Sequence, residues 1–426
     1  MASEENKTVS NRRSAFTLYV ALAVATVLKL LWASHSIGSV DAILFKTFAS
    51  EIEETGLKRV YTEIRFYNHT PLTSAVISGI YQISKVPIEL PASAGPAVKA
   101  AAEHRREVLE MQDFTFWLRL LSILMDAIVV LSLYRCRRLL GDPPLWALCL
   151  LALSPVSLMI SGFHGNIDGV MIGFLVLATL ASIGNRPILS AVLFALACNV
   201  KIVPLCLAPV FFFFWLPRGK AWRFTVVTMG LLFLGFLWGL INCPAEFVRN
   251  VFGYASYWGN WGLTLALRLT GWAPVQELDF LKQTGTEIAI MQALKFVIVA
   301  GIAAIGWLRR NQPAPALMAT LAMAWLCFST LAPGVGTQYF VWLAPFLAIA
   351  YPRAYALHLT AASIFLFAFY STVTEDPFPW KTAIPRIYEH HAWALTGGLC
   401  WLASAVIFIA VLRRRFHAAT LSEMKR

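Results

Sequence analysis

Apolar and polar positions along the chain alternate in long blocks. Apolar runs recur from residue 15 to close to the C-terminus, and several approach the roughly 20 residues that a helix needs to cross a bilayer. The first long polar interruption covers residues 35–113. This pattern predicts an all-α polytopic membrane protein with a long first outer loop.

The apolar runs predict about twelve transmembrane helices. The first is residues 15–34, read as a retained helix, and the second is residues 114–134. The others run approximately over 146–161, 169–183, 188–200, 203–216, 224–241, 288–308, 316–331, 339–350, 354–370 and 392–412. Several are short for a crossing, and short or broken helices are tolerated where they line a cavity. We therefore expect the turns near His164 and Lys201 to face a site.

The loop of residues 35–113 contains three segments with helical patterns. The first runs from Asp41 to Thr55, with apolar residues on one face, carboxylates opposite and Gly56 able to end it. Thr70 can cap a second helix that begins at Pro71, which is too short for a crossing and is expected to lie on or dip into the bilayer. Residues 97–113 are a third amphipathic candidate that leads into the second span.

Composition and charge agree with a membrane protein. Hydrophobic residues make up 58% of the chain and charged residues 14%, which excludes a soluble core in a polar shell. The net charge of +12 is explained by arginines and lysines gathering in inner loops, and this places residues 1–14 and 413–426 as cytoplasmic tails around a membrane domain of residues 114–412. A nucleic-acid partner is not expected.

The seven cysteines lack the spacing of a disulfide framework or a zinc site. We therefore expect no metal site and no cofactor, although a divalent metal is compatible with the chemistry considered below.

Polar residues at the outer ends of the spans are the candidates for chemistry. Asp41 lies a few residues beyond the first span, where a carboxylate can serve as a base or favour the start of its own helix. His164, Asn166 and Asp168 interrupt an apolar hairpin, either as a solvated turn or as groups that bind substrate hydroxyls. Lys201 lies between two apolar runs, and it can reach the interface or hold a phosphate.

Three further features extend this set. Trp258 and Arg268 belong to an aromatic and glycine-rich segment that suits either an interfacial belt or a site for a lipid phosphate or a sugar. Gln338 and Tyr339 occupy a later outer turn. Arg119 and Asp126 lie within the second span, where a charged residue is a functional candidate by default and a structural pair between the two is an equal alternative.

The order of these motifs resembles the GT-C superfamily of polyprenyl-phosphate-sugar-dependent glycosyltransferases. The resemblance is carried by an aspartate soon after the first span, then YNHTPLTS, HGNIDG, NVKIVP and QYFVWLAP. The loop is similar to that of the dolichyl-phosphate-glucose glucosyltransferases of N-glycan assembly, and also to bacterial polyprenyl-phosphate-mannose transferases. The chain departs from the eukaryotic glucosyltransferases at His69-Thr70-Pro71, which replaces a double proline, and at Thr337-Gln338-Tyr339, which replaces His-Glu-Lys.

The resemblance implies an inverting hexosyltransferase that uses a polyprenyl-phosphate-sugar donor and a lipid-linked or glycan acceptor on the outer side of the membrane. Asp41 is the expected base, and Lys201 and Arg268 the expected ligands of the donor phosphate. Sugar or acceptor would be bound by a larger set: Asn68, His69, His164, Asn166, Asp168, Trp258, Gln338 and Tyr339. Compact loops favour a bacterial inner membrane over the endoplasmic reticulum.

Two other functions remain compatible with the sequence. About twelve spans with embedded polar residues also suit a secondary transporter of a small polar or anionic solute, although the two halves show no internal similarity. A lipid-linked polysaccharide polymerase or ligase is the third possibility, and its large outer loop is expected late in the chain, whereas here it is early.

Overall fold

The chain is helical throughout the residues that the computed structural model describes, which are 2–87, 95–253, 262–264, 267, 270, 285–373 and 389–423. No strand occurs among these residues. The all-α fold predicted from the sequence is confirmed.

The N-terminal part consists of five helices. They are α1 (Ala2–His35), α2 (Val40–Thr55), α3 (Leu57–Glu63), α4 (Pro71–Ser84) and α5 (Pro96–Arg135). The third predicted loop helix and the second span are one continuous helix, α5, because no glycine or proline interrupts residues 97–135. At 40 residues, α5 is about 60 Å long and reaches well beyond the apolar band.

The rest of the chain forms a bundle of long and short helices. In order they are η1 (Arg137–Leu140), α6 (Leu145–Ala152), α7 (Pro155–Ser157), η2 (Leu158–His164), α8 (Asp168–Ile183), α9 (Pro187–Val200), η3 (Val203–Leu207), α10 (Ala208–Trp215), η4 (Leu216–Arg218), α11 (Ala221–Asn242), α12 (Pro244–Phe247), η5 (Val248–Phe252), α14 (Gly285–Leu308), α15 (Ala316–Leu331), η7 (Thr337–Tyr339), α16 (Phe340–Ala350), α17 (Pro352–Val373) and α18 (Glu389–Glu423).

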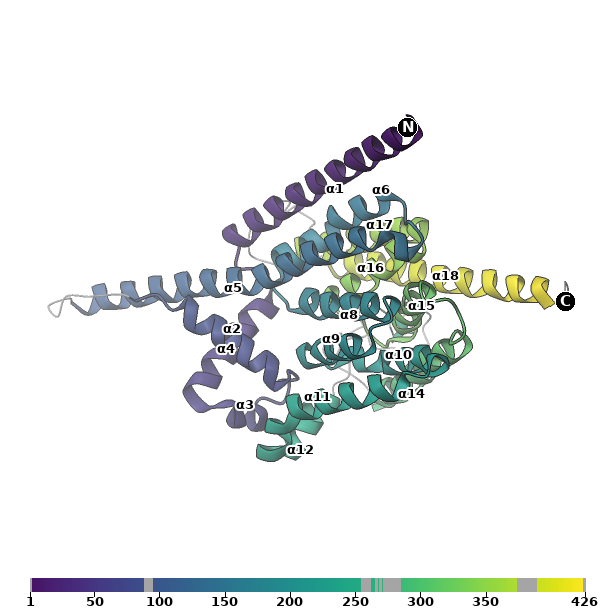
Figure 1. Cartoon of the computed structure of the whole chain (residues 1–426). Coiled ribbons are helices and arrows are strands. Elements are labelled where there is room, and N and C mark those ends of the chain that lie inside the picture. Colours follow the sequence, from purple (N-terminus) through teal and green to yellow (C-terminus); the bar gives the residue numbers. More distant parts are fainter. Residues whose placement is uncertain are drawn as a thin grey trace.

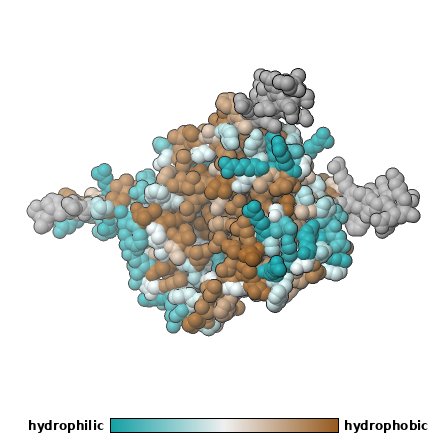
Figure 2. Space-filling view, in the orientation of Figure 1, coloured by the Kyte–Doolittle hydropathy of each residue, from teal (hydrophilic) through white to brown (hydrophobic). Residues whose placement is uncertain are grey.

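The protein is a multi-pass membrane protein. Within the described residues, seven helices are long and apolar enough to cross a membrane, and five shorter apolar helices accompany them. Large apolar side chains such as Phe296, at 78% exposure, face outward as expected where lipid is the solvent. Figure 2 shows the resulting hydrophobic band across the middle of one face, with hydrophilic side chains gathered toward its ends.

The short helices lie inside the bundle. Helix α16 is buried along nearly its whole length, and it packs against α15, α17, α8 and α6. Because protein rather than lipid surrounds them, such short elements can end within the bundle and leave polar turns there. One of these turns is the π-helical segment η2, which ends at His164.

The loop helices form a layer at one end of the bundle. Helices α2, α3 and α4 lie together on the left in Figure 1, and the two chain ends lie on the right. Helix α2 packs on α4 and α5, and α12 packs on α3. The first loop therefore covers one end of the bundle, and the side chains at the start of α2 face the outer turns of the short helices.

Local sequence signals set the ends of these loop helices as predicted. Ser39 caps α2 by accepting a hydrogen bond from the Asp41 amide, and Gly56 ends the helix with a φ of 86°. Thr70 caps α4 through the Thr73 amide, directly before Pro71. Helix α4 has 14 residues and is not among the apolar helices suited to crossing a membrane. That it lies on or dips into the bilayer remains a prediction.

Candidate active site

Asp41 lies in the first turn of α2, where its carboxylate meets the turn that follows η2. The Oδ2 atom accepts hydrogen bonds from His164 Nε2 and from Asn166 Nδ2, each at 3.0 Å. Among the described residues no hydrogen bond reaches Oδ1, and the side chain is 35% exposed. One oxygen is therefore held in place, while the other is available to a ligand.

The carboxylate of Asp41 is not the helix cap, because Ser39 performs that role. The Ser39 hydroxyl also donates to the backbone carbonyl of His164 at 2.7 Å, and the Ser39 amide donates to the same carbonyl at 3.2 Å. The start of α2 and the end of η2 are thus joined by backbone contacts as well as by side chains.

Two glycines allow this close approach. Gly38 and Gly165 both have positive φ, at 97° and 79°. A Cβ atom on Gly38 would lie 2.5 Å from the Phe163 carbonyl oxygen, and one on Gly165 would lie 2.7 Å from the Ala42 Cβ atom. Only glycine fits at either position without separating the two segments that hold Asp41.

Arg119 is fully buried and ties the same segments together. Its guanidinium donates to the Ser36 hydroxyl at 2.8 Å and to the Ser36 carbonyl at 2.5 Å. It also donates to the carbonyls of Gly162 and Phe163 in η2, at 3.5 and 3.4 Å. Arg119 thereby satisfies backbone acceptors that the π-helical turn and the end of α1 leave open.

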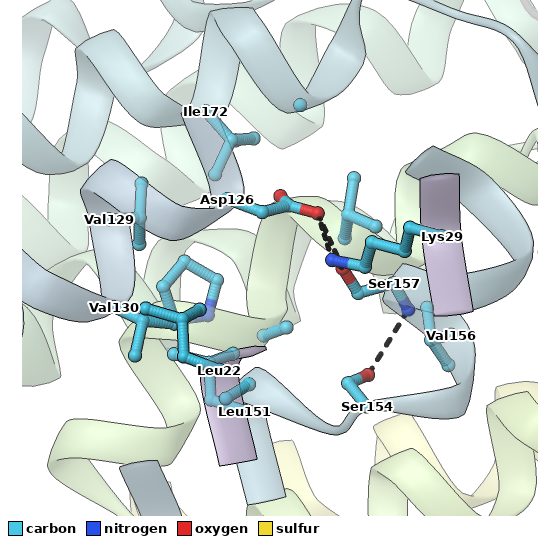
Figure 3. Close-up of a pocket in the computed structure, with 15 residues that line it drawn as sticks. Leu22, Lys29, Asp126, Val129, Val130, Leu151, Ser154, Val156, Ser157 and Ile172 are labelled. Carbon is cyan, nitrogen blue, oxygen red and sulfur yellow. Dashed lines mark hydrogen bonds and ion pairs between the residues drawn. The ribbon is translucent and has the colours of Figure 1, made fainter. Parts of the chain in front are cut away.

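The structural pair of Arg119 and Asp126, one of the two alternatives from the sequence, does not form. The two residues are seven positions apart on α5, which separates them by about 10 Å along the helix. Asp126 pairs instead with Lys29 of α1, at 2.6 Å, and Ser157 donates to the same oxygen at 2.6 Å. The three groups line a small pocket, where apolar side chains such as Leu22, Val129 and Ile172 surround them (Figure 3).

His164 connects Asp41 to a buried tyrosine. The Nδ1 atom of His164 lies 2.7 Å from the Tyr370 hydroxyl, which also lies 3.3 Å from Thr337 Oγ1. When the neutral imidazole donates its Nε2 proton to Asp41, Nδ1 becomes the acceptor for Tyr370. Tyr370, of α17, therefore holds the ring orientation that suits Asp41.

Asp168 and Lys201 form a second polar group in the bundle. The Lys201 ammonium donates to both Asp168 oxygens, at 2.8 and 3.2 Å, and the Trp342 indole donates to Oδ2 at 3.1 Å. The Asp168 side chain is fully buried, whereas Lys201 keeps 12% exposure. Lys201 also lies over the Tyr339 and Trp342 rings, 5.4 and 5.5 Å from their centroids.

The loop before α4 closes over the end of α9 next to Lys201. Thr70 donates to the Asn199 carbonyl, and Thr73 Oγ1 donates to the Val200 carbonyl at 2.6 Å. These bonds supply donors to the last carbonyls of α9. His69 and Asn68 are half-buried in the same loop, and the His69 ring packs on Phe45 of α2 with centroids 4.7 Å apart.

Burial and nearby charges shift two pKa values in the site. Burial alone would raise the pKa of Asp41, but His164, Asn166 and Lys201 outweigh it and lower the pKa to about 2. For His69, burial lowers the pKa to about 3, helped by Lys201 and opposed by Asp41. Asp41 is therefore ionised and His69 neutral at physiological pH.

The structure brings together most of the predicted site. Asp41, His164 and Asn166 form one cluster, and Asp168, Lys201 and Tyr339 form another. Gln338 is linked to the Asp41 cluster only through other residues. The Thr337 hydroxyl lies next to Tyr370 and donates to Gln338 Oε1 at 3.4 Å. Trp258 and Arg268 lie outside the described residues.

Sequence reasoning missed Tyr370, Trp342, Ser39 and Lys29. Tyr370 and Trp342 read as ordinary aromatic residues of apolar spans, so their sequence context carries no signal of a polar role. Ser39 could have been recognised as the helix cap from its position two residues before Asp41. Lys29 could have been flagged as a charged residue within the first span.

No group of three or more His, Cys, Asp or Glu side chains in the described residues is arranged to hold a metal ion. The expectation that the protein needs no metal or other cofactor stays a prediction.

Comparison with known proteins supports the predicted resemblance. The model of the ALG6, ALG8 glycosyltransferase family matches residues 98–243, from α5 through α11. This segment contains His164, Asn166, Asp168 and Lys201 and leaves Asp41 outside. No curated protein sequence is significantly similar to the chain. The match supports a membrane-embedded glycosyltransferase.

Among solved structures, the chain is similar to the oligosaccharyltransferase of Archaeoglobus fulgidus in its apo form. The sequence identity is 14% and the TM-score is 0.45. The match covers 93% of this chain and 56% of that one, so the chain spans little more than half the length of the archaeal enzyme. A likeness at this level carries no information about substrate or reaction.

Proposed function

We propose that the protein is an inverting hexosyltransferase that moves a hexose from a polyprenyl-phosphate donor to an acceptor hydroxyl on the outer side of the membrane. The observation that carries this proposal is the Asp41 carboxylate, with Oδ2 held by His164 and Asn166 and Oδ1 open to a ligand. The acceptor is a lipid-linked or glycan hydroxyl, and we place the protein in a bacterial inner membrane.

The reaction is a single displacement at the anomeric carbon. The acceptor oxygen forms a bond to that carbon while its proton passes to Asp41 Oδ1. The bond between the anomeric carbon and the phosphate oxygen breaks, and polyprenyl phosphate leaves with the bonding electrons. Because attack and departure occur on opposite sides, the configuration inverts. Asp41 then returns its proton to water.

The leaving phosphate gains negative charge, which Lys201 is placed to stabilise. Asp168 holds the Lys201 ammonium through two hydrogen bonds, and this leaves Lys201 at 12% exposure with its position defined. A preorganised cation stabilises developing charge more effectively than one that must be ordered during the reaction. Asp168 therefore acts in this proposal as a positioning residue for the phosphate ligand.

Donor binding also prepares the base. A carboxyl with a pKa of about 2 is ionised but accepts protons weakly, since an efficient base has a pKa nearer the working pH. Part of that low pKa comes from the charge on Lys201. A bound phosphate next to Lys201 opposes this charge, so the pKa of Asp41 rises when the donor is present.

The test is sugar transfer by the purified full chain in detergent, with a panel of radiolabelled polyprenyl-phosphate hexoses and a membrane lipid extract as acceptor. Asp41→Asn keeps the shape of the side chain and removes the base, so transfer should fall by about 10²- to 10⁴-fold. Donor binding and the elution profile of the folded protein should be retained.

The matched control is Asp142→Asn, because Asp142 is 67% exposed and pairs only loosely with Arg137, at 3.7 Å. Its transfer rate should equal that of the unaltered chain. Full transfer by a folded Asp41→Asn variant would disprove the assignment of the base, and no transfer from any donor would argue against the reaction itself.

A further inference from the structure

A cluster of arginines lies at the end of the bundle remote from Asp41. Arg218 follows α10, and Arg309 and Arg310 follow α14. Helix α11 begins three residues after Arg218 and ends next to α12, which packs on α3 of the outer loop. Since α11 has 22 residues and is about 33 Å long, the cluster lies roughly one membrane thickness from that loop.

Arg309 is the buried member of this cluster, with 7% exposure. Its Nε donates to Thr320 Oγ1 at 2.7 Å, and its Nη2 donates to the Ala316 carbonyl at 3.3 Å. Its Nη1 has no hydrogen-bond partner in the described part of the chain. Buried polar groups are normally paired, so a guanidinium nitrogen that finds no acceptor among the described residues is a candidate contact for a ligand.

Arg309 lines a small pocket that also contains Arg310. The pocket is small, with about 10 Å³ of space for a water-sized atom, and its apolar walls are formed by Val210, Phe214 and Leu317. Among the described residues the three arginines form no ion pair with a carboxylate. Arg218 donates to the Arg310 carbonyl at 3.4 Å and to the Gln312 carbonyl at 2.9 Å. Its guanidinium therefore lies against the loop that follows α14.

The side chains around the pocket place it at the level of lipid headgroups. Trp307 is 45% exposed and Leu308 74% exposed, as expected for residues that face lipid near the interface. The Arg310 guanidinium lies over the Trp307 ring, 3.6 Å from its centroid. A cation that stacks on an interfacial tryptophan beside a basic pocket is well placed to meet the phosphate of a lipid.

We infer that this pocket binds the phosphate of an anionic phospholipid headgroup in the leaflet opposite Asp41. One phosphate oxygen accepts hydrogen bonds from Arg309 Nη1 inside the pocket, and the rest of the headgroup lies at the mouth beside Arg310. The acyl chains run along the exposed apolar surface next to Leu308. The site is separate from the sugar-transfer site, and the inference does not depend on the proposed reaction.

The experiment is native mass spectrometry of the full chain in a neutral detergent, titrated with phosphatidylglycerol or with phosphatidylcholine of the same acyl chains. The unaltered chain should bind phosphatidylglycerol more tightly. Arg309→Gln should weaken that binding by about fivefold or more, which is what one cation near a membrane surface contributes. Arg310→Gln should weaken it in the same direction and tests the site without altering a buried residue.

Arg353→Gln is the matched control. Arg353 is exposed near the start of α17, whose other end carries Tyr370, so it lies at the same end of the molecule as Arg309. Its binding of phosphatidylglycerol should be unchanged. Equal binding by the unaltered chain, Arg309→Gln and Arg310→Gln would overturn the inference, and so would a loss in Arg353→Gln as large as that in Arg310→Gln.

A separate titration with inorganic phosphate distinguishes a lipid site from a site for a free anion. In the inferred site, 10 mM phosphate, roughly the concentration of a common buffer, should displace little phosphatidylglycerol because it lacks the acyl chains. Complete displacement by inorganic phosphate would show that the pocket binds free phosphate and would overturn the lipid assignment.

Discussion

Asp41 and Asp168 are two carboxylates of one site with different surroundings. Asp41 uses one oxygen for two hydrogen bonds and leaves the other open, with 35% of its side chain exposed. Asp168 is fully buried, and its oxygens accept three hydrogen bonds from Lys201 and Trp342. The same chemical group can therefore serve as a base at one position and as a structural counter-ion at the other.

In the proposed reaction, the two carboxylates have different roles. A base needs an open oxygen and a partner that holds it in place without taking that oxygen, and His164 with Asn166 provides this. A positioning carboxylate needs the opposite, because a fully satisfied ion pair is stable only when water is excluded and its geometry is good. If sugar transfer survives in Asp41→Asn, Asp168 is a poor alternative base. Both of its carboxylate oxygens already accept hydrogen bonds from Lys201 or Trp342.

The largest effect on stability is expected at Asp168. Asp168→Asn leaves the Lys201 ammonium nearly buried without its counter-ion, which costs about 3–5 kcal/mol. The thermal unfolding temperature in detergent, followed by tryptophan fluorescence, should fall well below that of Asp142→Asn.

The double variant Asp168→Asn/Lys201→Gln sharpens this test, because it removes both charges. It should unfold at a higher temperature than Asp168→Asn alone. If both single variants and the double variant have the same unfolding temperature, the ion pair does not distinguish Asp168 from Asp41.

The next effect in size is expected at Gly165, which lets Asp41 and His164 approach. Gly165→Ala places a Cβ atom against Ala42 at a φ of 79°, so the variant should lose about 1–3 kcal/mol of stability. Sugar transfer should fall as well, because the start of α2 moves away from His164. Gly230→Ala is the control, since a Cβ atom there meets nothing within 4 Å. Equal stability of the two variants would contradict the close approach.

A smaller effect is expected at Tyr370. Tyr370→Phe removes the hydroxyl that holds His164 Nδ1, so kcat should fall about tenfold while the KM for the donor stays the same. The loss should appear in kcat alone, because the His164 ring keeps its contact with Asp41 and loses its hydrogen bond at Nδ1. Tyr351→Phe is the matched control, since the buried Tyr351 hydroxyl has no hydrogen-bond partner among the described residues. An unchanged kcat in Tyr370→Phe would rule out a positioning role.

The smallest effect is expected on the pH dependence of stability. His69 and Asp41 should contribute to it in different pH ranges. His69 has its pKa lowered from 6.5 to about 3, so the unfolded chain binds its proton first and stability falls as pH drops below about 6.5. Asp41 has its pKa lowered from 3.8 to about 2, so its contribution is lost only below pH 3.8.

Between pH 7 and 5, His69 should therefore account for about 1 kcal/mol of lost stability, a value reduced for its partial exposure. Unfolding temperatures measured across this range should fall less steeply for His69→Gln than for the unaltered chain. A substitution of the exposed His35 by Gln is the control. The same slope in all three proteins would show that the surroundings of His69 do not hold it neutral.

The sequence determined much of the fold through short-range signals. Apolar runs of suitable length predicted the membrane helices, and the caps at Ser39, Gly56 and Thr70 lie within a few residues of the helix ends that they set. The predicted loop helix of residues 97–113 and the second span form one continuous helix in the structure. Nothing within residues 97–135 interrupts the helix, and the expected boundary rested on a change of polarity alone.

The tertiary structure decided which polar side chains meet. Asp41 and His164 are 123 positions apart, and Asp168 and Trp342 are 174 apart. Lys29 replaced Arg119 as the partner of Asp126 because helix packing brings α1 beside α5, whereas residues seven positions apart on one helix cannot touch. Caps and apolar periods act over one or two helical turns and can be read from the chain. Contacts between distant helices depend on how their side chains pack, and that is settled only when the bundle forms.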